Sequence, residues 1–237
     1  MARIRAVLFD IDGTLLDSND AHAHAWLDSL RGHGHNVPFE RVRSKIGTGA
    51  DKLLPAVVGI SSDSIEGRSI TERRAMILKA HYLPDVGPFH GARVLVDRLR
   101  SRGLICVAVS SATADDAQDL LRAAGVADLM DAVITSDDVD RSKPDPDLLA
   151  VALEAVGVTA SEALMIGDTL YDIEAGARAG VPVVALRCGG APERDLEGAI
   201  ALYDDPADLS SQLDRSPLAL DRESDPPMHR PRMRASI

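Results

Sequence analysis

The feature that most constrains the fold is a regular alternation of short apolar runs and helical segments between residues 91 and 189. Runs at 104–109, 132–135, 163–166 and 182–186 have the length of buried strands, and helical spacing occupies the segments 92–101, 115–124, 146–156 and 171–179. Strands that alternate with helices are joined by right-handed crossovers, which make the strands parallel and place helices on both faces. The sequence therefore predicts an α/β fold with a parallel sheet.

A helical insertion interrupts this pattern near the N-terminus. Residues 4–9 form another apolar run, but the pattern from 19 to 88 is helical and closes with Pro84, Gly87 and Pro88. We expect a Rossmann-like core of residues 1–18 and 89–213, with an all-helical cap domain, 19–88, inserted after the first strand. Such an insertion lies beside the carboxyl ends of the strands, where open α/β sheets bind ligands.

The last segment, 214–237, differs in composition from the rest of the chain. It combines four prolines with scattered arginines and few apolar residues, which predicts disorder. The alternative is an interaction tail built on Arg230, Arg232 and Arg234.

Charge and composition exclude several classes of partner. The net charge is −11 and only 3% of residues are aromatic, whereas nucleic-acid binding favours basic surfaces and stacking side chains. No run is apolar enough to span a membrane, and the N-terminus leads directly into a strand without a signal-peptide core. We expect a cytoplasmic protein, a monomer or a homodimer, that binds neither nucleic acid nor membranes.

Two acids follow the first predicted strand. If the extended backbone continues past Phe9, Asp10 and Asp12 share one side of it, because strand side chains alternate. Two adjacent carboxylates repel unless a cation offsets their charge, and Mg²⁺ favours such hard oxygen ligands. A turn or a helix cap is the alternative for this pair taken alone.

Polar side chains of a matching kind follow three other strands. Ser110 and Ser111 offer hydroxyls and backbone amides to an oxyanion, and Lys143 precedes a helix as a point charge for phosphate. Asp168 and Asp172 stand four residues apart and share one face if the helix has already begun. Each residue alone has a simpler explanation as a cap or a surface side chain. All of them at one sheet edge predict a Mg²⁺ ion and a phosphoryl group held together, as phosphoryl transfer requires.

The motifs FDIDGT, VSSA, SKPDP and GDTLYD resemble those of the haloacid dehalogenase superfamily, in the branch with a helical cap, over residues 4 to 213. The chain is similar to phosphoglycolate phosphatases and beta-phosphoglucomutases. The resemblance implies roles for the strand-end residues: Asp10 as the nucleophile that forms an aspartyl-phosphate, Asp12 as general acid and base, Ser110, Ser111 and Lys143 for the phosphoryl group, Asp10, Asp168 and the backbone carbonyl of Asp12 for Mg²⁺, and Asp172 with Thr14 in support.

Asp12 separates the possible activities. Dehalogenases of this superfamily resemble the chain but lack the second acid, because a halide leaves without a proton. A phosphatase needs Asp12 protonated for the leaving alcohol, so we expect burial or a neighbouring anion to raise its pKa. The favoured function is a phosphatase acting on a small phosphorylated metabolite. A phosphomutase and a non-catalytic binding module on the same fold are the alternatives.

The cap supplies the remaining candidates. His22 matches a position that helical-cap phosphatases and mutases use near the hinge, which indicates a hinge or substrate contact. Gly47 and Gly49 permit close approach to a ligand, and Lys52 can reach an anionic group on the leaving side. A plain helix connection with an exposed lysine is the alternative reading of this segment.

Overall fold

A six-stranded, wholly parallel sheet forms the centre of the computed structural model, which describes residues 3–219. The strand order is β3-β2-β1-β4-β5-β6, the order of doubly wound α/β folds. The prediction of a Rossmann-like α/β fold is therefore confirmed. The strands are β1 (Ala6–Phe9), β2 (Ile105–Val109), β3 (Ala132–Ile134), β4 (Ala163–Gly167), β5 (Val183–Leu186) and β6 (Ala201–Tyr203).

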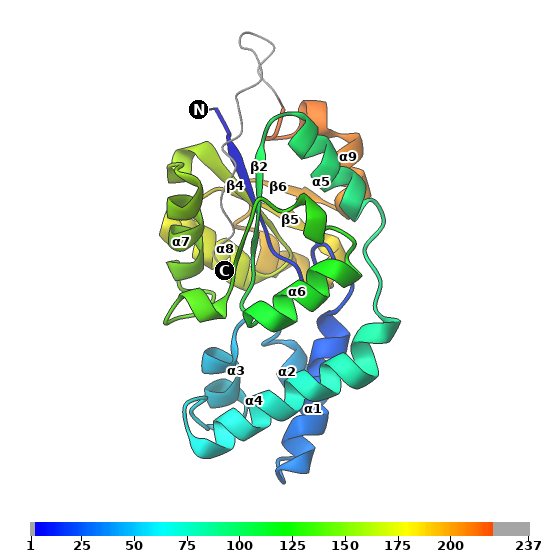
Figure 1. Ribbon diagram of the computed structural model, residues 1–237, viewed down its shortest axis with the longest axis vertical. Helices are drawn as coiled ribbons and strands as arrows, with labels where there is room; N and C mark the ends of the chain where they lie inside the picture. Colours follow the sequence, from blue (N-terminus) through cyan, green and yellow to red (C-terminus); the bar gives the residue numbers. More distant parts are fainter. Residues whose placement is uncertain (1–2, 220–237) are drawn as a thin grey trace.

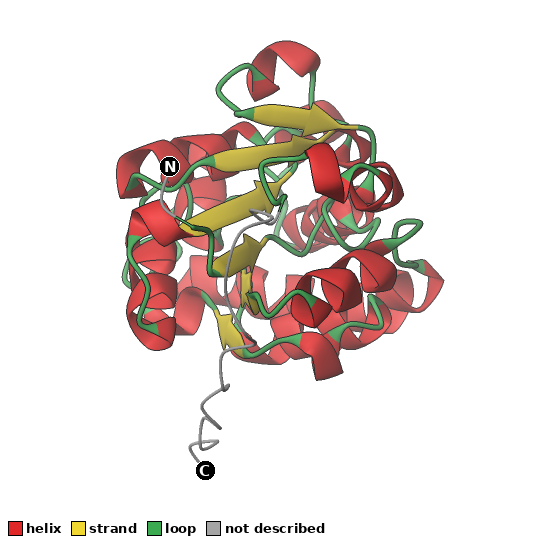
Figure 2. Ribbon diagram, turned by 90° about the horizontal axis from the view of Figure 1, so that it is seen from above, coloured by secondary structure: helices red, strands yellow, loops and turns green. Residues whose placement is uncertain are grey.

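Helices cover both faces of the sheet, as Figure 2 shows. Alternation along β1 explains the two layers, because Val7 and Phe9 pack into one apolar cluster while Ala6 and Leu8 pack into the other. The first cluster includes α5 (Ala92–Ser101), α6 (Ala114–Ala123) and α9 (Pro206–Ser211), and the second includes α7 (Asp147–Val156) and α8 (Leu170–Ala179).

The chain changes direction across the sheet between β1 and β4. From β1 it proceeds to β2 and β3 on one side, and from β4 to β5 and β6 on the other. Loops therefore diverge where β1 and β4 end side by side, with Phe9 opposite Ile166. In open α/β sheets this switch point is the place where ligands bind.

The inserted helices form a separate layer against the carboxyl ends of the strands (Figure 1). They are α1 (Asn19–Gly32), α2 (Phe39–Arg43), α3 (Ala50–Val58) and α4 (Ile65–Ile77), and a π-helical turn, Leu78–Tyr82, extends α4. This layer has its own apolar cluster around Trp26, Leu30 and Leu54. Burial of one face of each helix in that cluster explains why the segment folds apart from the sheet.

Two features at the C-terminal end differ from the sequence expectations. β6 was not anticipated, because its three residues are followed at once by Asp204, Asp205 and Pro206, which are typical of a loop. The segment predicted to be disordered begins with residues that pack: Leu218 is 2% exposed and joins the cluster that contains Val7 and Phe9. The remainder of that prediction, with Arg230, Arg232 and Arg234, lies outside the described residues.

Within residues 3–219, no helix combines the length and the apolar character needed to cross a lipid bilayer.

Candidate active site

Three acids and one lysine meet where β1 and β4 end. Asp10 follows β1, Asp168 follows β4, Asp172 lies in the first turn of α8, and Lys143 comes from the loop before α7. The Lys143 Nζ bonds to Asp10 Oδ1 and lies 2.8 Å from Asp172 Oδ1. Lys143 is fully buried, so its ammonium is held by these carboxylates rather than by water. The structure thus brings together four residues that are spread over 163 positions of the sequence.

The turn between β4 and α8 fixes Asp172. Its Oδ2 accepts hydrogen bonds from Thr169 N at 3.0 Å and from Thr169 Oγ1 at 2.7 Å. Thr169 is the N-cap of α8, and this reciprocal pairing is a capping box. α8 begins at Leu170, so Asp168 precedes the helix, and its backbone N–H donates to Asp172 Oδ2 at 3.3 Å. With Oδ2 occupied, Oδ1 of Asp172 is left for Lys143.

Asp168 is held from two directions. Thr14 Oγ1 lies 3.1 Å from Asp168 Oδ1 and 3.4 Å from Asp10 Oδ2, so this hydroxyl can donate to either acid. Asn19, at the start of α1, donates its Nδ2 to Asp168 Oδ2 at 2.9 Å. A Cβ on Gly189 would meet Asp168 Oδ2 at 1.8 Å, so only glycine fits against this carboxylate.

The charges at this junction do not balance. Burial, opposed by the Lys143 charge, raises the pKa of Asp10 to about 7. Burial and the charges of Asp10 and Asp172 also raise the pKa of Asp168. Burial lowers the pKa of Lys143, but Asp10 and Asp172 outweigh it and the net shift is upward. Three carboxylates and one ammonium carry a net charge of −2 when all are ionised.

A divalent cation would balance this excess negative charge. Oxygens of Asp10, Asp168 and Asp172 lie within 4.8 Å of one another, and all three acids are buried. The buried Oδ1 of Asn19, whose Nδ2 is bonded to Asp168, has no hydrogen-bond partner. Hard oxygen donors of this kind suit Mg²⁺. Both oxygens of Asp172 are engaged by Lys143 and Thr169, whereas Asp10 Oδ2 and Asp168 Oδ1 share the single proton of the Thr14 hydroxyl, so one of these two oxygens is left to offer a metal.

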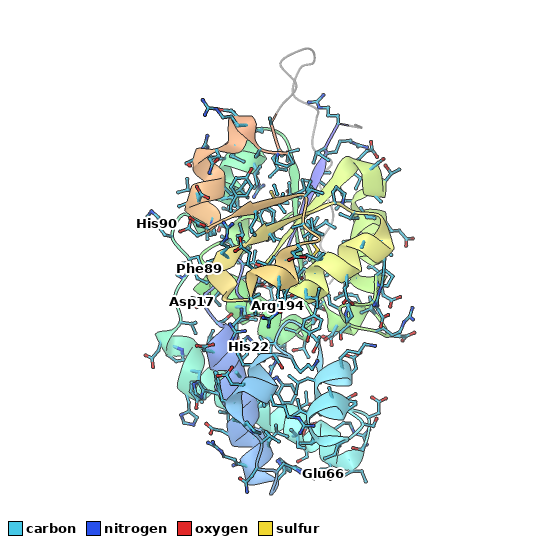
Figure 3. The ribbon with its side chains drawn as sticks, turned by 180° about the vertical axis from the view of Figure 1, so that it is seen from behind. Asp17, His22, Glu66, Phe89, His90 and Arg194 are labelled. Atoms are coloured by element: carbon cyan, nitrogen blue, oxygen red, sulfur yellow. The ribbon has the colours of Figure 1, made fainter. Side chains whose placement is uncertain are left out.

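Asp12 turns towards the helical layer and pairs with His22. The His22 Nε2 lies 2.8 Å from Asp12 Oδ1, and the Ser18 hydroxyl donates to the same oxygen. Figure 3 shows His22 at the junction of the helical layer and the sheet layer. Burial acts to raise the pKa of Asp12, but the charge and hydrogen bond of His22 and the hydrogen bond of Ser18 lower it below its usual value. The expectation of a raised pKa is therefore wrong, because the sequence does not reveal that His22 faces Asp12.

A cavity of about 350 Å³ lies between the two layers. Asp10, Asp12, Ser110 and Ser111 line it from the sheet side, and His22 lines it from α1. Ser110 is buried, and its Oγ accepts a hydrogen bond from the backbone N–H of Ala112 at 3.1 Å. Ser111 Oγ donates to the carbonyl of Gly47 at 3.3 Å and so joins the layers across the cavity.

The cap loop approaches the core more closely than the sequence indicated. Gly47 and Gly49 line the cavity, but a Cβ on Gly47 would meet Thr169 at 3.0 Å, and the N–H of Gly49 donates to Ser142 Oγ at 2.9 Å. Lys52 is not among the residues that line the cavity. Its Nζ lies 2.7 Å from Asp145 Oδ2, outside that space. α3 thus places the Lys52 side chain against the loop that carries Lys143, and a contact of Lys52 with the substrate stays a prediction.

A family model agrees with this arrangement over most of the chain. Residues 4–180 match the model of the haloacid dehalogenase-like hydrolases. The chain belongs to the haloacid dehalogenase-like hydrolase family. Because the match ends at residue 180, it covers β1, the helical insertion, β2 to β4 and α8.

Two curated relatives of this hydrolase are named as phosphatases. It is 33% identical to the N-acetylmuramic acid 6-phosphate phosphatase of Pseudomonas aeruginosa, over 90% of this chain and 96% of the relative. It is 32% identical to the phosphoglycolate phosphatase of Rhodospirillum rubrum, over 88% and 90% of the two chains. Family and relatives together identify a phosphoric monoester hydrolase of the haloacid dehalogenase type.

Solved structures show the same fold. A hydrolase from Pseudomonas syringae superposes with a TM-score of 0.83 at 30% identity, covering 89% of this chain and 98% of that one. A putative beta-phosphoglucomutase from Bacteroides vulgatus superposes with a TM-score of 0.78 at 24% identity, covering 90% and 88%. The second likeness concerns the fold alone.

Several residues of this hydrolase's site were missed at the level of sequence. Ser18 and Asn19 precede a helical pattern and look like helix-start residues, yet they bond Asp12 and Asp168. Arg74 also lines the cavity, from α4. Its only sequence signal is a place in the run TERRAM, where the rotation of the helix decides which arginine faces inward.

Proposed function

We propose that this hydrolase is a Mg²⁺-dependent phosphatase that cleaves a small phosphorylated metabolite through an aspartyl-phosphate on Asp10. The observation that carries the proposal is the buried contact of Lys143 with Asp10, which lines the cavity, with a carboxylate oxygen of Asp168 within 4.8 Å of Asp10. A carboxylate can attack phosphorus without losing a proton, provided that cations offset the repulsion between the two anions. Lys143 supplies one positive charge, and the carboxylates that Lys143 does not neutralise can bind a metal cation as a second.

Each residue then has a defined task. Asp10 Oδ attacks the phosphorus, the bond from phosphorus to the ester oxygen breaks, and the leaving oxygen takes a proton held by the Asp12 and His22 pair. Water then attacks the phosphorus of the aspartyl-phosphate, Asp12 accepts its proton, and inorganic phosphate leaves with Asp10 restored. Asp10 and Asp168, with the backbone carbonyl of Asp12, would hold Mg²⁺, which would supply positive charge to the phosphoryl oxygens.

The shape of the molecule supports a small substrate. Residues 19–88 act as a cap over a core made of 1–18 and 89–213, and the cavity of about 350 Å³ lies between them. Sites of this size hold small molecules. Phosphoglycolate and sugar phosphates are the candidates to test, and Ser110, Ser111 and Lys143 are the groups proposed to bind the phosphoryl group.

Hydrolysis of para-nitrophenyl phosphate tests the proposal. We expect turnover with Mg²⁺, loss of turnover with a chelator, and abolition by Asp10→Asn. Asp63→Asn is the matched control, since this acid is exposed and does not line the cavity. Absence of turnover across a broad panel of phosphate esters would leave a binding module as the better account.

The phosphomutase alternative makes a different product. A mutase would return the phosphoryl group to the sugar, whereas a phosphatase releases it to water. The phosphatase relatives described above favour release. Incubation with a hexose 1-phosphate decides between them, because isomer formation would indicate a mutase and free phosphate a phosphatase.

A further inference from the structure

Arg74 is a buried cation in the cavity with no role in the proposed chemistry. It comes from α4 of the helical layer and lines the same cavity as Asp10 and Asp12. Within residues 3–219, it is the only arginine or lysine among the lining residues. An arginine at this place faces whatever part of a substrate extends away from Asp10 into the helical layer.

The guanidinium of Arg74 is held rigidly but is incompletely paired. Its Nη1 lies 2.7 Å from Asp116 Oδ2 in α6, and its Cζ lies over the Trp26 ring, 5.1 Å from the ring centroid. The residue is 9% exposed, and its Nε has no hydrogen-bond partner. Buried polar groups in proteins are normally satisfied, so an unpartnered N–H beside a cavity indicates a missing acceptor.

The charges of the side chains that line the cavity indicate the chemical class of this acceptor. Six carboxyl groups line the space: Asp10, Asp12, Asp51, Glu72, Asp116 and Asp140. Away from Asp10, where the phosphoryl group is proposed to bind, Arg74 is the arginine or lysine, among the lining residues within 3–219, that can attract an anionic group. The guanidinium fork matches a carboxylate, since two of its N–H groups can bond two oxygens side by side.

We propose that Arg74 makes this enzyme selective for phosphate esters whose leaving group carries a carboxylate, which bonds the Nε side of its guanidinium. Asp116 and Trp26 hold the guanidinium in place for this contact. The inference rests on the proposed phosphatase function. Arg74 is thus a specificity residue that acts at the end of the substrate remote from the phosphorus.

Matched esters isolate this contact. Phosphoglycolate carries a carboxylate where 2-hydroxyethyl phosphate carries a hydroxymethyl group. The pair 3-phosphoglycerate and glycerol 3-phosphate differs in the same way. For the wild type we expect kcat/KM to favour the carboxylate member of at least one pair by about tenfold or more, the size of one charge-assisted hydrogen bond. Arg74→Gln should reduce that ratio to about one, and Arg74→Lys should keep part of it.

Controls separate selectivity from folding and from chemistry. Para-nitrophenyl phosphate lacks a carboxylate and serves as the reference ester, so the loss of kcat/KM that Arg74→Gln causes on the carboxylate esters should exceed its loss on this ester. Arg73→Gln removes an exposed neighbouring arginine and should leave every ratio unchanged. Asp116→Asn keeps Arg74 while removing its protein partner, so the carboxylate preference should persist in a variant that still contains the arginine.

Three results would overturn the proposal. A wild type that hydrolyses both members of each pair equally well has no carboxylate site. If Arg74→Gln lowers kcat/KM by the same factor for every ester, the ratio within each pair stays unchanged. Arg74 would then have only a structural role, in packing against Asp116. Failure of the wild type on para-nitrophenyl phosphate as well would remove the phosphatase function itself, and the inference with it.

Discussion

Lys143 is the counter-charge on which three buried carboxylates depend, so Lys143→Met tests the electrostatics of the site. Methionine keeps an apolar stem of similar length but leaves Asp10 and Asp172 without their cation. Removal of one partner from a buried ion pair costs about 3–5 kcal/mol. A domain has a free energy of unfolding of about 5–15 kcal/mol, so the loss is a large share of the total. We expect this destabilisation at pH 8 in the presence of a chelator.

The deficit should depend on pH. In the folded protein the pKa of Asp10 is raised to about 7, above its usual value of 3.8. A raised carboxyl pKa means that the folded state binds the proton more tightly, so this contribution to stability is fully present at low pH and is lost as pH rises through about 7. Without Lys143 the buried acids protonate still more readily. The difference between variant and wild type should therefore shrink as pH falls from 8 to 5.

Urea unfolding, followed by far-ultraviolet circular dichroism and by the fluorescence of the single tryptophan, Trp26, measures both effects. Lys79→Met is the control, since Lys79 is 69% exposed and pairs with Asp119 at the surface. Its loss should stay below about 1 kcal/mol. A Lys143→Met variant as stable as the wild type at pH 8, or an equal deficit at pH 5 and pH 8, would refute the reasoning.

Three further predictions concern the metal, the cap and the thiol. Carboxylates bind Mg²⁺ only when ionised, and the pKa values of Asp10 and Asp168 are raised. Mg²⁺ should therefore raise the melting temperature more at pH 8 than at pH 5. Equal shifts at the two pH values would contradict a metal site on these two acids. Lys52→Ala removes a partly exposed ion pair with Asp145. The free energy of unfolding in urea should change by less than about 1 kcal/mol, and kcat/KM by less than about fivefold. A larger loss of kcat/KM would show that Lys52 contacts the substrate. Burial raises the pKa of the Cys188 thiol to about 12, so thiol reagents at pH 8 should label it far more slowly in the native protein than in urea; equal rates would show an accessible thiolate.

The place where polar side chains meet could be predicted from the sequence because it follows from topology. Asp10 and Asp168 each stand directly after an apolar run, and the runs proved to be adjacent parallel strands. Residues at the carboxyl ends of neighbouring parallel strands must lie close together, whatever their separation along the chain. The fold class follows from the same alternation.

What could not be predicted depends on helix rotation and on packing between the layers. Arg73 and Arg74 are neighbours in the sequence, and the rotation of α4 about its axis decides which of them faces the cavity. The sequence around them does not reveal that rotation. The pKa of Asp12 depends on His22, whose orientation is set by how α1 leaves the sheet. Lys52 likewise bonds Asp145 because of the way α3 docks on the core, which local sequence does not encode.

The most direct test of the central claim is the location of the phosphoryl group on the protein. The Asp12→Asn variant keeps the nucleophile but lacks the base for hydrolysis, and para-nitrophenolate leaves without a proton. Rapid acid quenching with this ester, followed by peptide mass spectrometry, should therefore find a phosphoryl group on Asp10. Turnover by the wild type with no phosphorylated peptide in the variant, or with the label on a residue other than Asp10, would contradict the account.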